Sequence, residues 1–539
     1  MDISLNLKTK IQAALAKLGQ DVSLNDIIIE KSKDTTHGDY ATNSAMKFCR
    51  LFSKSPRDVA SLIVENIDME GIDKVEIAGP GFINIFMKND SLQIFVKKII
   101  NEGDNYGRSV RKNQKINVEF VSANPTGLLH VGTARGAAIG DSVCRILDFA
   151  GYDVTREYYI NDAGSQITNL ALSIQARYKE LFGMEAEIPE DGYAGQDIIE
   201  IAQSIKDEIG DAALKMDDPV SFFKEKGMKI ELDRIVKDLD TFRVKFDVFS
   251  SEKAIRADNA IEKEIAFLKD YVYEADNALY LKTTAFVDDK DRVIRKGNGD
   301  YTYFMPDICY HVNKMSRGFD QLIDVLGADH HGYINRMKSA LMMHGYKEDA
   351  LHVELIQMVR FLKDGQEFKA SKRRGDAITL RDVCEEVGVD AMRYFFAMRA
   401  ASTHLDFDMD LAIEQSSNNP VYYAQYAHAR LCSISEQGKD IALDESGKNL
   451  KEVSELALLK HLADFANMVN DAAKEKAPYK VANYIHALAE LVHVFYNDCR
   501  VIDRENVELS ASRLALVKAS QIVLKNALAL IGVSAPIHM

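Results

Sequence analysis

The spacing of hydrophobic and polar residues divides the chain into three parts. Residues 1 to about 105 alternate helical periodicity with a short strand-like stretch at 74–77, which the turn Gly79-Pro80-Gly81 follows. This pattern predicts a separate α+β unit over residues 1–105. From Leu411 to the end, apolar residues recur at helical spacing almost without interruption, which predicts an all-α domain.

The middle part has the pattern of a parallel α/β sheet. Residues 116–121 have strand character and run into a loop that carries proline and glycine. A helical pattern extends from about His130 to Ala150, and residues 153–159 form a second strand-like stretch. A strand, a glycine-bearing loop, a helix and a second strand make the βαβ unit of a nucleotide-binding sheet. We therefore expect a Rossmann-type domain here.

Three domains are expected in all. Residues 165–285, approximately, are charged and mostly helical in pattern, which indicates an insertion between two halves of the sheet. The central domain is then 106–405 and the all-α domain 406–539. A chain of 539 residues has ample length for several cores, because single domains usually stop growing well before this size.

Composition indicates a folded protein of the cytoplasm. The hydrophobic share of 47% and the charged share of 28% are ordinary for a soluble globular chain. No apolar run approaches the roughly 20 residues that span a bilayer, and the first residues resemble an amphipathic helix without a cleavable signal. The six cysteines are dispersed without a CxxC pair, so we expect neither disulfides nor zinc.

The net charge of −15 argues against indiscriminate binding to nucleic acid. It still permits one RNA to bind along a local basic track. The densest positive run is 369–374, and such a run taken alone is usually a solvated loop.

Candidate chemistry begins directly after the first strand of the βαβ unit. The segment reads Ser122-Ala123-Asn124-Pro125-Thr126-Gly127-Leu128-Leu129-His130-Val131-Gly132-Thr133. Amides at a helix start and small glycines allow a triphosphate to approach closely, and His130 can donate to a phosphate oxygen. An isolated HxG is more often a plain strand-to-helix turn, so the surrounding residues must distinguish such a turn from a phosphate-binding site.

A second segment, Lys369-Ala370-Ser371-Lys372-Arg373, follows about 240 residues later. Two lysines three residues apart on a loop can stabilise charge that develops on a leaving pyrophosphate. In this order and at this distance the two segments resemble the signature motifs of class I aminoacyl-tRNA synthetases, the first in the extended form of the arginyl enzymes. Thr133 stands where the family has a final histidine, and Ala370 replaces the usual methionine.

The resemblance implies residues that act on ATP. Three are implied as catalytic: His130, Lys369 and Lys372. Those implied to bind ATP are Gly127, His130, Gly132, Gly327, Asp329, Lys369 and Lys372. Gly327 and Asp329 belong to a third segment, 324–333, where an apolar strand ends in Gly-Ala-Asp. The adjacent His330 and His331 point to opposite sides and lack a third ligand, so no metal site is expected.

A guanidinium needs a carboxylate in a partly dry pocket to read its planar fork of donors. Tyr303-Phe304-Met305-Pro306-Asp307 resembles the family's arginine-binding element. Without that resemblance, Asp307 reads as a helix cap and Tyr303 as a core aromatic. The resemblance makes Asp307 the main guanidinium partner and Tyr303 its neighbour. It also implies that the amino acid pocket contains Glu119, Ser122, Asn124 and His330.

Both ends of the chain resemble the family too. Residues 419–430 are similar to the opening of its anticodon-binding domain, where aromatic and basic side chains can stack on unpaired bases and contact phosphate. The tRNA contacts expected in this segment are Tyr426 and Arg430, and a third, Arg373, is expected in the basic run 369–374. Residues 36–43 and 78–84 resemble the additional amino-terminal domain that binds the outer corner of tRNA.

The resemblance implies an arginyl-tRNA synthetase that activates L-arginine with ATP and Mg²⁺ and transfers it to the terminal adenosine of tRNA(Arg). No tightly bound cofactor is expected, and the enzyme is expected to be a monomer. Three alternatives stay open: another nucleotidylyltransferase with an HxGH motif, a tRNA-binding paralogue without chemistry, and a cysteinyl enzyme. The distant basic loop argues against the first, the retained His130, Lys369 and Lys372 against the second, and the cysteine spacing against the third.

Overall fold

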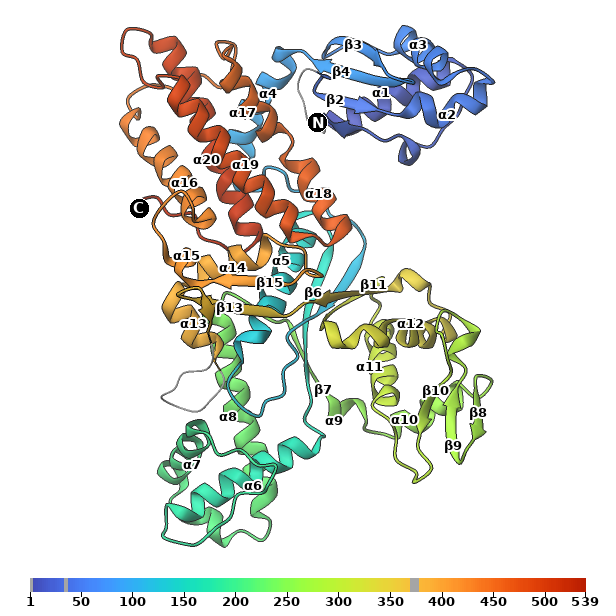
Figure 1. The fold of residues 1–539 in the computed structure, drawn as a ribbon, viewed down its shortest axis with the longest axis vertical. Helices are drawn as coiled ribbons and strands as arrows, with labels where there is room; N and C mark the ends of the chain where they lie inside the picture. The colour runs from blue at the N-terminus through green and yellow to red at the C-terminus, as the bar shows by residue number, and fades with distance from the viewer. Residues whose placement is uncertain (1–2, 33–36, 369–377) are drawn as a thin grey trace.

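A computed structural model describes residues 3–32, 37–368 and 378–539. The predicted site residues that lie outside these ranges are Lys369, Lys372 and Arg373. Figure 1 shows a small α+β unit, a central α/β body with two excursions, and a bundle of long helices. The predicted fold class, a parallel α/β domain between an α+β unit and an all-α domain, is confirmed.

The amino-terminal unit is an antiparallel sheet with helices. Its elements are α1 (Ile3–Lys17), β1 (Glu30–Lys31), β2 (Tyr40–Thr42), α2 (Ser44–Phe52), α3 (Pro56–Asn66), β3 (Ile72–Ala78), β4 (Phe82–Met87) and α4 (Asn89–Glu102). The strands lie in the order β1-β2-β4-β3. Gly81, between β3 and β4, has a φ of +138°, and a Cβ there would lie 2.9 Å from the carbonyl of Pro56. Only glycine fits this turn without strain.

The central body is built on a five-stranded parallel sheet. Its strands are β5 (Lys115–Glu119), β6 (Asp153–Ile160), β7 (Val248–Ser251), β11 (Gln321–Gly327) and β12 (Leu351–Ile356). They lie in the order β12-β11-β5-β6-β7. The chain passes from β5 through α5 (Ala134–Phe149) to β6 on one side, while β11 pairs with β5 on the other. In such sheets ligands bind at the carboxyl ends of the strands that flank this switch point.

The helix α5 is almost entirely buried between the sheet and the carboxyl-terminal helices. Gly140 faces the ring of Phe120, and a Cβ at Gly140 would lie 2.4 Å from that ring. Glycine therefore lets the helix approach the sheet closely. The predicted helix from about His130 is confirmed, with residues 130–133 forming the turn that leads into it.

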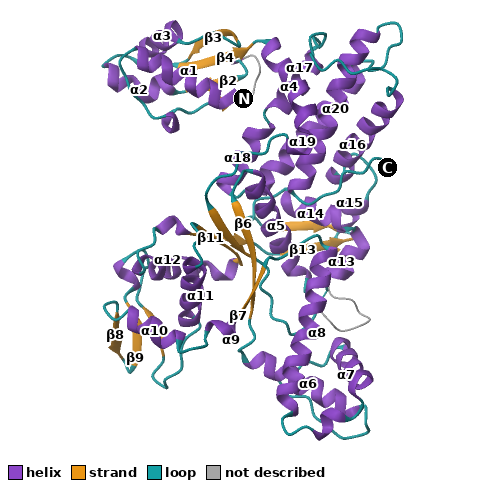
Figure 2. Cartoon of the chain, turned by 180° about the vertical axis from the view of Figure 1, so that it is seen from behind, coloured by secondary structure: helices purple, strands orange, loops and turns teal. Residues whose placement is uncertain are grey.

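Two excursions leave the sheet, which Figure 2 shows between them and the helical bundle. The first contains α6 (Ser165–Glu180), α7 (Gln196–Ile209) and α8 (Pro219–Thr241). The second contains α9 (Glu252–Ile255), α10 (Ala260–Phe267), β8 (Val272–Ala275), β9 (Ala278–Leu281), β10 (Arg292–Arg295) and α11 (Phe304–Ser316). The sequence predicted one mostly helical insertion over about 165–285. Instead, the strand β7 lies within that range and pairs with β6 in the central sheet. It has only four residues, of mixed polarity, so its sequence pattern is too short to predict a strand.

The remaining elements complete the body and form the bundle. After β11 come α12 (Ile334–Met343), β13 (Val359–Lys363), β14 (Gln366–Glu367), α13 (Leu380–Val387), α14 (Val389–Ala397), β15 (Leu405–Asp408) and α15 (Met409–Ile413). The bundle contains α16 (Pro420–Gln437), α17 (Val453–Ala463), α18 (Phe465–Glu475), α19 (Pro478–Asp498) and α20 (Val507–Leu530). Residues 409–539 are helical or loop, and the expected start of the all-α domain at 406 falls inside β15, which pairs with β13.

The amino-terminal unit contacts the bundle directly. The ammonium of Lys31 lies 3.3 Å from the carboxylate of Asp464, and that of Lys460 lies 2.5 Å from Asp39. The helix α4 packs against α17 and α20. Across the described ranges, no helix combines the length and the apolar character needed to cross a membrane.

Candidate active site

Strained backbone marks the end of β5. Val121 and Ser122 have φ values of +67° and +41°, a region that side chains with a Cβ rarely adopt. The Ser122 hydroxyl donates to Glu119 at 3.0 Å and accepts from the backbone N–H of Tyr159 at 3.1 Å. Such strain costs about 1–3 kcal/mol per residue and persists where surrounding contacts enforce it, which is common at functional sites.

The turn that follows fixes the orientation of His130. The backbone N–H of Gly132 donates to His130 Nδ1 at 2.8 Å, and a Cβ on Gly132 would lie only 2.8 Å from the same nitrogen. A neutral imidazole that accepts at Nδ1 carries its proton on Nε2. Because His130 is exposed, its Nε2–H can donate to an incoming phosphate. The Thr133 hydroxyl donates to the carbonyl of His130 at 2.7 Å and holds the turn closed.

The chain that follows residues 369–377 is anchored beside this turn. His130 and Thr379 form an antiparallel bridge, and the N–H of Val131 donates to the carbonyl of Ile378 at 2.9 Å. On the other side of the segment, the N–H of Phe368 donates to the carbonyl of Phe361 at 2.8 Å. The residues on both sides of the basic segment are therefore held by backbone hydrogen bonds, while Lys369, Lys372 and Arg373 lie outside the described residues.

A buried ionic network lies beneath the switch point. The ammonium of Lys314, a fully buried side chain on α11, lies 2.7 Å from Glu119 at the end of β5 and 2.9 Å from Asp324 on β11. Asp324 also lies 2.7 Å from His311 Nε2, and His311 Nδ1 lies 2.8 Å from the backbone carbonyl of Asp307. Burial alone would lower the pKa of Lys314, but the carboxylates of Asp324 and Glu119 outweigh it and raise that pKa.

Asp307 is a carboxylate of this region without an ion pair to any described residue. It lies in the first turn of α11 and is partly buried. Its carboxylate makes no hydrogen bond or ion pair with any residue that the structure describes. Burial raises the pKa of Asp307 to about 7; nearby His311 opposes this rise, and Glu119 adds to it. A ligand cation at this position would relieve an unfavourable buried charge.

Sequence reasoning missed most of the network. The sequence spacing could have predicted it, because Asp307, His311 and Lys314 are four and three residues apart and so lie on one face of a helix. Tyr159 was missed as well; burial, and then the carboxylates of Glu252 and Asp307, raise its pKa.

A cavity of about 700 Å³ opens above α9 and the start of α11. Its lining residues include Asn124, Asn161, Gln166, Glu252 and Tyr303. The Asn124 amide donates to Gln166 at 2.6 Å, whereas the buried Oδ1 of Asn161 has no donor among the described residues. The structure thus brings the predicted Asn124 and Tyr303 to one cavity, with Tyr303 85% exposed at its rim.

The described residues that are predicted to bind ATP follow the carboxyl ends of β5 and β11. Gly127 and His130 line a second cavity of about 510 Å³, together with Thr379. Gly327 ends β11, and a Cβ on it would lie 2.7 Å from the carboxylate of Asp329. His330 and Asp329 are exposed, with His330 Nε2 3.8 Å from that carboxylate. Neither residue lines the cavity that contains Tyr303.

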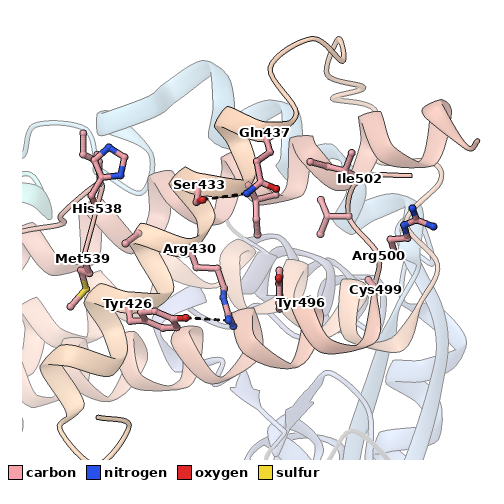
Figure 3. Close-up of a pocket in the computed structure, with 14 residues that line it drawn as sticks. Tyr426, Arg430, Ser433, Gln437, Tyr496, Cys499, Arg500, Ile502, His538 and Met539 are labelled. Carbon is pink, nitrogen blue, oxygen red and sulfur yellow. Dashed lines mark hydrogen bonds between the residues drawn. The ribbon is translucent and has the colours of Figure 1, made fainter. Parts of the chain in front are cut away.

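A third cavity, of about 550 Å³, lies in the helical bundle between α16, α19 and the last residues of the chain (Figure 3). Arg430 lies between two tyrosines, its guanidinium carbon 5.0 Å from the ring centre of Tyr426 and 4.2 Å from that of Tyr496. Arg430 also donates to the Tyr426 hydroxyl at 3.2 Å. Rings and a guanidinium that face an open cavity are suited to stacking with unpaired bases.

A parallel sheet with an HxG turn at its switch point, residues 378–379 bridged to that turn directly after the basic segment, and a terminal helical bundle together define a class I aminoacyl-tRNA synthetase. Three family models match the chain: "Arginyl tRNA synthetase N terminal domain" at residues 5–87, "tRNA synthetases class I (R), catalytic domain" at 95–431 and "DALR anticodon binding domain" at 424–539. The chain belongs to the arginyl-tRNA synthetase family.

Individual relatives agree. The "Arginine–tRNA ligase" of Bacillus subtilis (strain 168) is 50% identical over 99% of this chain and 98% of its own length. The "Arginine–tRNA ligase 2" of Bacillus thuringiensis subsp. konkukian is 51% identical over the same shares. The fold is also that of the arginyl-tRNA synthetase of Thermus thermophilus, with a TM-score of 0.79 and 22% identity over the whole of both chains.

Proposed function

We propose that this chain, an arginine–tRNA ligase by family, activates L-arginine with Asp307 as the guanidinium partner and transfers it to tRNA(Arg) in two steps. The arginine carboxylate first attacks the α-phosphate of MgATP and pyrophosphate leaves. The 2′-hydroxyl of the terminal adenosine then attacks the adenylate carbonyl, and AMP leaves. Neither step needs a covalent bond to the enzyme, so positioning and charge stabilisation supply the rate.

The observation that carries this proposal is the partly buried carboxylate of Asp307, which has no cationic partner among the described residues. Arginine supplies a planar guanidinium that can engage the carboxylate with two parallel hydrogen bonds, whereas lysine offers a point charge. Glu119, held by Lys314, adds negative potential nearby. The pocket residues proposed around the substrate are Ser122, Asn124, Tyr303 and His330.

ATP is proposed to lie along the carboxyl ends of β5 and β11. Gly127 and Gly132 leave room for the phosphates, and His130 donates its Nε2–H to one of them. Gly327 and Asp329 are proposed to hold the ribose. Lys369 and Lys372 are proposed to stabilise the departing pyrophosphate, with the magnesium arriving on ATP. Support for the lysines comes from Thr379, which follows their segment and is bridged to His130.

The tRNA is proposed to place its anticodon in the bundle cavity, where Tyr426 and Arg430 offer a ring and a guanidinium. Arg373 is proposed as a further RNA contact. The proposed domains are residues 1–105 for the outer corner of the tRNA, 106–405 for chemistry and 406–539 for the anticodon. The enzyme is proposed to act in the cytoplasm, where tRNA is charged, and as a monomer.

ATP–pyrophosphate exchange with each of the twenty amino acids, with and without total tRNA, tests the proposal. Exchange is expected with arginine alone, and Asp307→Asn should raise the arginine concentration needed. Exchange with a different amino acid, or an unchanged arginine requirement in folded Asp307→Asn enzyme, would overturn the guanidinium assignment.

A further inference from the structure

A fully buried cation follows the catalytic turn in the chain. Arg135 is the second residue of α5, and its side chain is fully enclosed by the protein. Burial lowers the pKa of its guanidinium to about 10, so the group remains charged at neutral pH. A charge in the interior is unfavourable unless it is paired, so the partners of Arg135 decide what this residue does.

Backbone carbonyls accept all the hydrogen bonds that Arg135 donates to the described residues. Its Nη1 donates to the carbonyl of Gln357 at 3.0 Å and to that of Thr403 at 2.7 Å. Its Nη2 donates to the carbonyl of Ala400 at 2.9 Å, and its buried Nε has no acceptor among the described residues. These bonds tie the loop after β12 and the loop after α14 to the start of α5. Carbonyl groups satisfy N–H donors, but they carry no net charge that would cancel the charge of the guanidinium.

The other charged residues of α5 have partners of opposite charge. The guanidinium of Arg145 lies 2.6 Å from the carboxylate of Asp141, one turn earlier on the helix. The carboxylate of Asp148 lies 3.0 Å from the guanidinium of Arg108. Arg135 forms no ion pair with any residue that the structure describes, and burial rather than a neighbouring charge lowers its pKa. Its positive charge is therefore not compensated by these residues.

The position of Arg135 on the helix is unfavourable for the helix itself. The peptide dipoles of a helix place positive charge at its first turn, and cations are favoured at its last turn. The same arrangement favours an anion that approaches the first turn from outside. Residues 130–133, which lead into α5, form the turn that carries His130. Proteins depart from such local stability rules mainly at functional sites.

We propose that the uncompensated charge of Arg135 attracts the phosphates of ATP to the turn at residues 130–133, which makes Arg135 a positioning residue for the nucleotide. Its charge adds to the positive end of α5, and the surrounding protein screens it less than water would. At an effective dielectric constant of about 20, a unit charge at about 10 Å changes the binding of a countercharge by roughly tenfold. The inference rests on the proposed placement of the ATP phosphates at this turn.

The test compares ligands that share a nucleoside and differ in charge. Dissociation constants of the full-length enzyme for adenosine, AMP and ATP are measured by competition against labelled ATP, in EDTA so that no metal ion screens the phosphates. Arg135→Met removes the charge and nearly keeps the length of the side chain. It should weaken the binding of ATP by roughly tenfold, that of AMP less and that of adenosine little, because an uncharged ligand does not respond to the lost potential. A parallel loss for all three ligands would overturn the proposal, since distortion of the loops predicts that result.

A second variant tests the charge without altering Arg135, because Arg135→Met leaves three carbonyls without their donor and can fail to fold. Thr403 is exposed, and Thr403→Asp adds a carboxylate on the residue whose carbonyl Arg135 contacts. It should weaken ATP binding several-fold and leave adenosine binding unchanged. Ser402→Asp adds the same charge on the adjacent exposed residue, whose carbonyl does not contact Arg135, and should have a smaller effect. Equal effects of the two carboxylates, or no effect of either, would overturn the role of Arg135.

Failure of this inference and failure of the proposed ATP site give different results. The wild type should bind ATP more tightly than adenosine, and His130→Ala should reduce that preference. If His130→Ala leaves the preference unchanged, the phosphates do not lie at this turn and the proposed placement of ATP is wrong. If His130→Ala reduces it while folded Arg135→Met keeps it, the placement of ATP holds and the role of Arg135 alone is wrong.

Discussion

Lys314 and Glu119 form a buried ion pair, 2.7 Å between nitrogen and oxygen, that joins α11 to the carboxyl end of β5. Lys314 also pairs with Asp324 on the neighbouring strand. One ammonium therefore separates two carboxylates that lie in register on adjacent strands. The proposed arginine site adjoins this pair, because Asp307 and Lys314 lie on the same face of α11.

Replacement of Lys314 by methionine should destabilise the fold. It leaves the charges of Glu119 and Asp324 buried and mutually repulsive, and breaking a buried pair in this way costs about 3–5 kcal/mol. Urea denaturation measures the change. The control Lys215→Met removes an exposed pair with Asp211 and should change the free energy of unfolding much less, because exposed pairs are screened by water. Equal effects of the two substitutions would show that the buried network contributes little.

The binding of arginine should depend on pH through Asp307. Burial raises the pKa of this carboxyl to about 7, so below that pH the group is largely protonated and cannot pair with a guanidinium. The KM for arginine should therefore fall as the pH rises from 6 towards 8 and level off above the pKa. Asp307→Asn should remove this pH dependence and raise KM by roughly 30-fold or more, in line with losing one partner of a desolvated charged pair. A KM that rises with pH would contradict the assignment.

Much of this site could be predicted from the sequence, because its motifs are local. The strand, turn and helix around His130 lie within one short segment. The alternative interpretation of Asp307 as a helix cap is wrong, because Tyr303 is the N-cap of α11 and Asp307 lies within its first turn. The partners of these residues come from distant segments. Lys314 meets Glu119 only because β5 and β11 are neighbours, and that adjacency depends on the topology of the sheet.

The exposure of Tyr303 could not be predicted either. A tyrosine four residues before an aspartate fits a core position as well as a pocket rim, and only the fold places it 85% exposed. Similarly, Asn161 belongs to no motif. That its Oδ1 has no donor among the described residues depends on the fold, which brings segments of both excursions together around the cavity.

The basic loop should act on ATP. Lys372→Ala is expected to lower kcat in ATP–pyrophosphate exchange by about 10²-fold or more, the usual effect of removing a group that stabilises developing charge. Lys363→Ala, at the end of β13 and paired with Glu386, is a nearby control and should change kcat little. Intact exchange together with lost tRNA binding would show instead that Lys372 contacts RNA.

Arg430 should contribute to the affinity for tRNA. It lies between Tyr426 and Tyr496 at the bundle cavity, and its removal takes away a cation and the packing of both rings. Arg430→Ala should weaken tRNA binding about tenfold and reduce the salt dependence of log Kd by about one unit if the guanidinium contacts a phosphate. Lys439→Ala, just beyond α16, removes an exposed cation outside the cavity and serves as the control. Equal losses in both variants would point to general electrostatic attraction.

Thr133 should prove a positioning residue in spite of its departure from the family pattern. Its hydroxyl donates to the carbonyl of His130 at 2.7 Å, a bond that closes the turn carrying the imidazole. Thr133→Val keeps the shape of the side chain but removes this bond, at a cost of about 1 kcal/mol, or roughly fivefold in the fraction of correctly closed turns. The expected result is a fall of that order in kcat/KM for ATP in pyrophosphate exchange, with kcat/KM for arginine affected less.

Thr133→Ser supplies the control for that experiment, because it restores the donor and should restore the rate. His130→Ala should cause a larger loss, since it removes the proposed phosphate donor itself. If Thr133→Val and Thr133→Ser behave alike, the hydroxyl has no part in orienting His130. The histidine that the family pattern has at the position of Thr133 would then be expected to contact substrate directly, and another residue would make that contact in this chain.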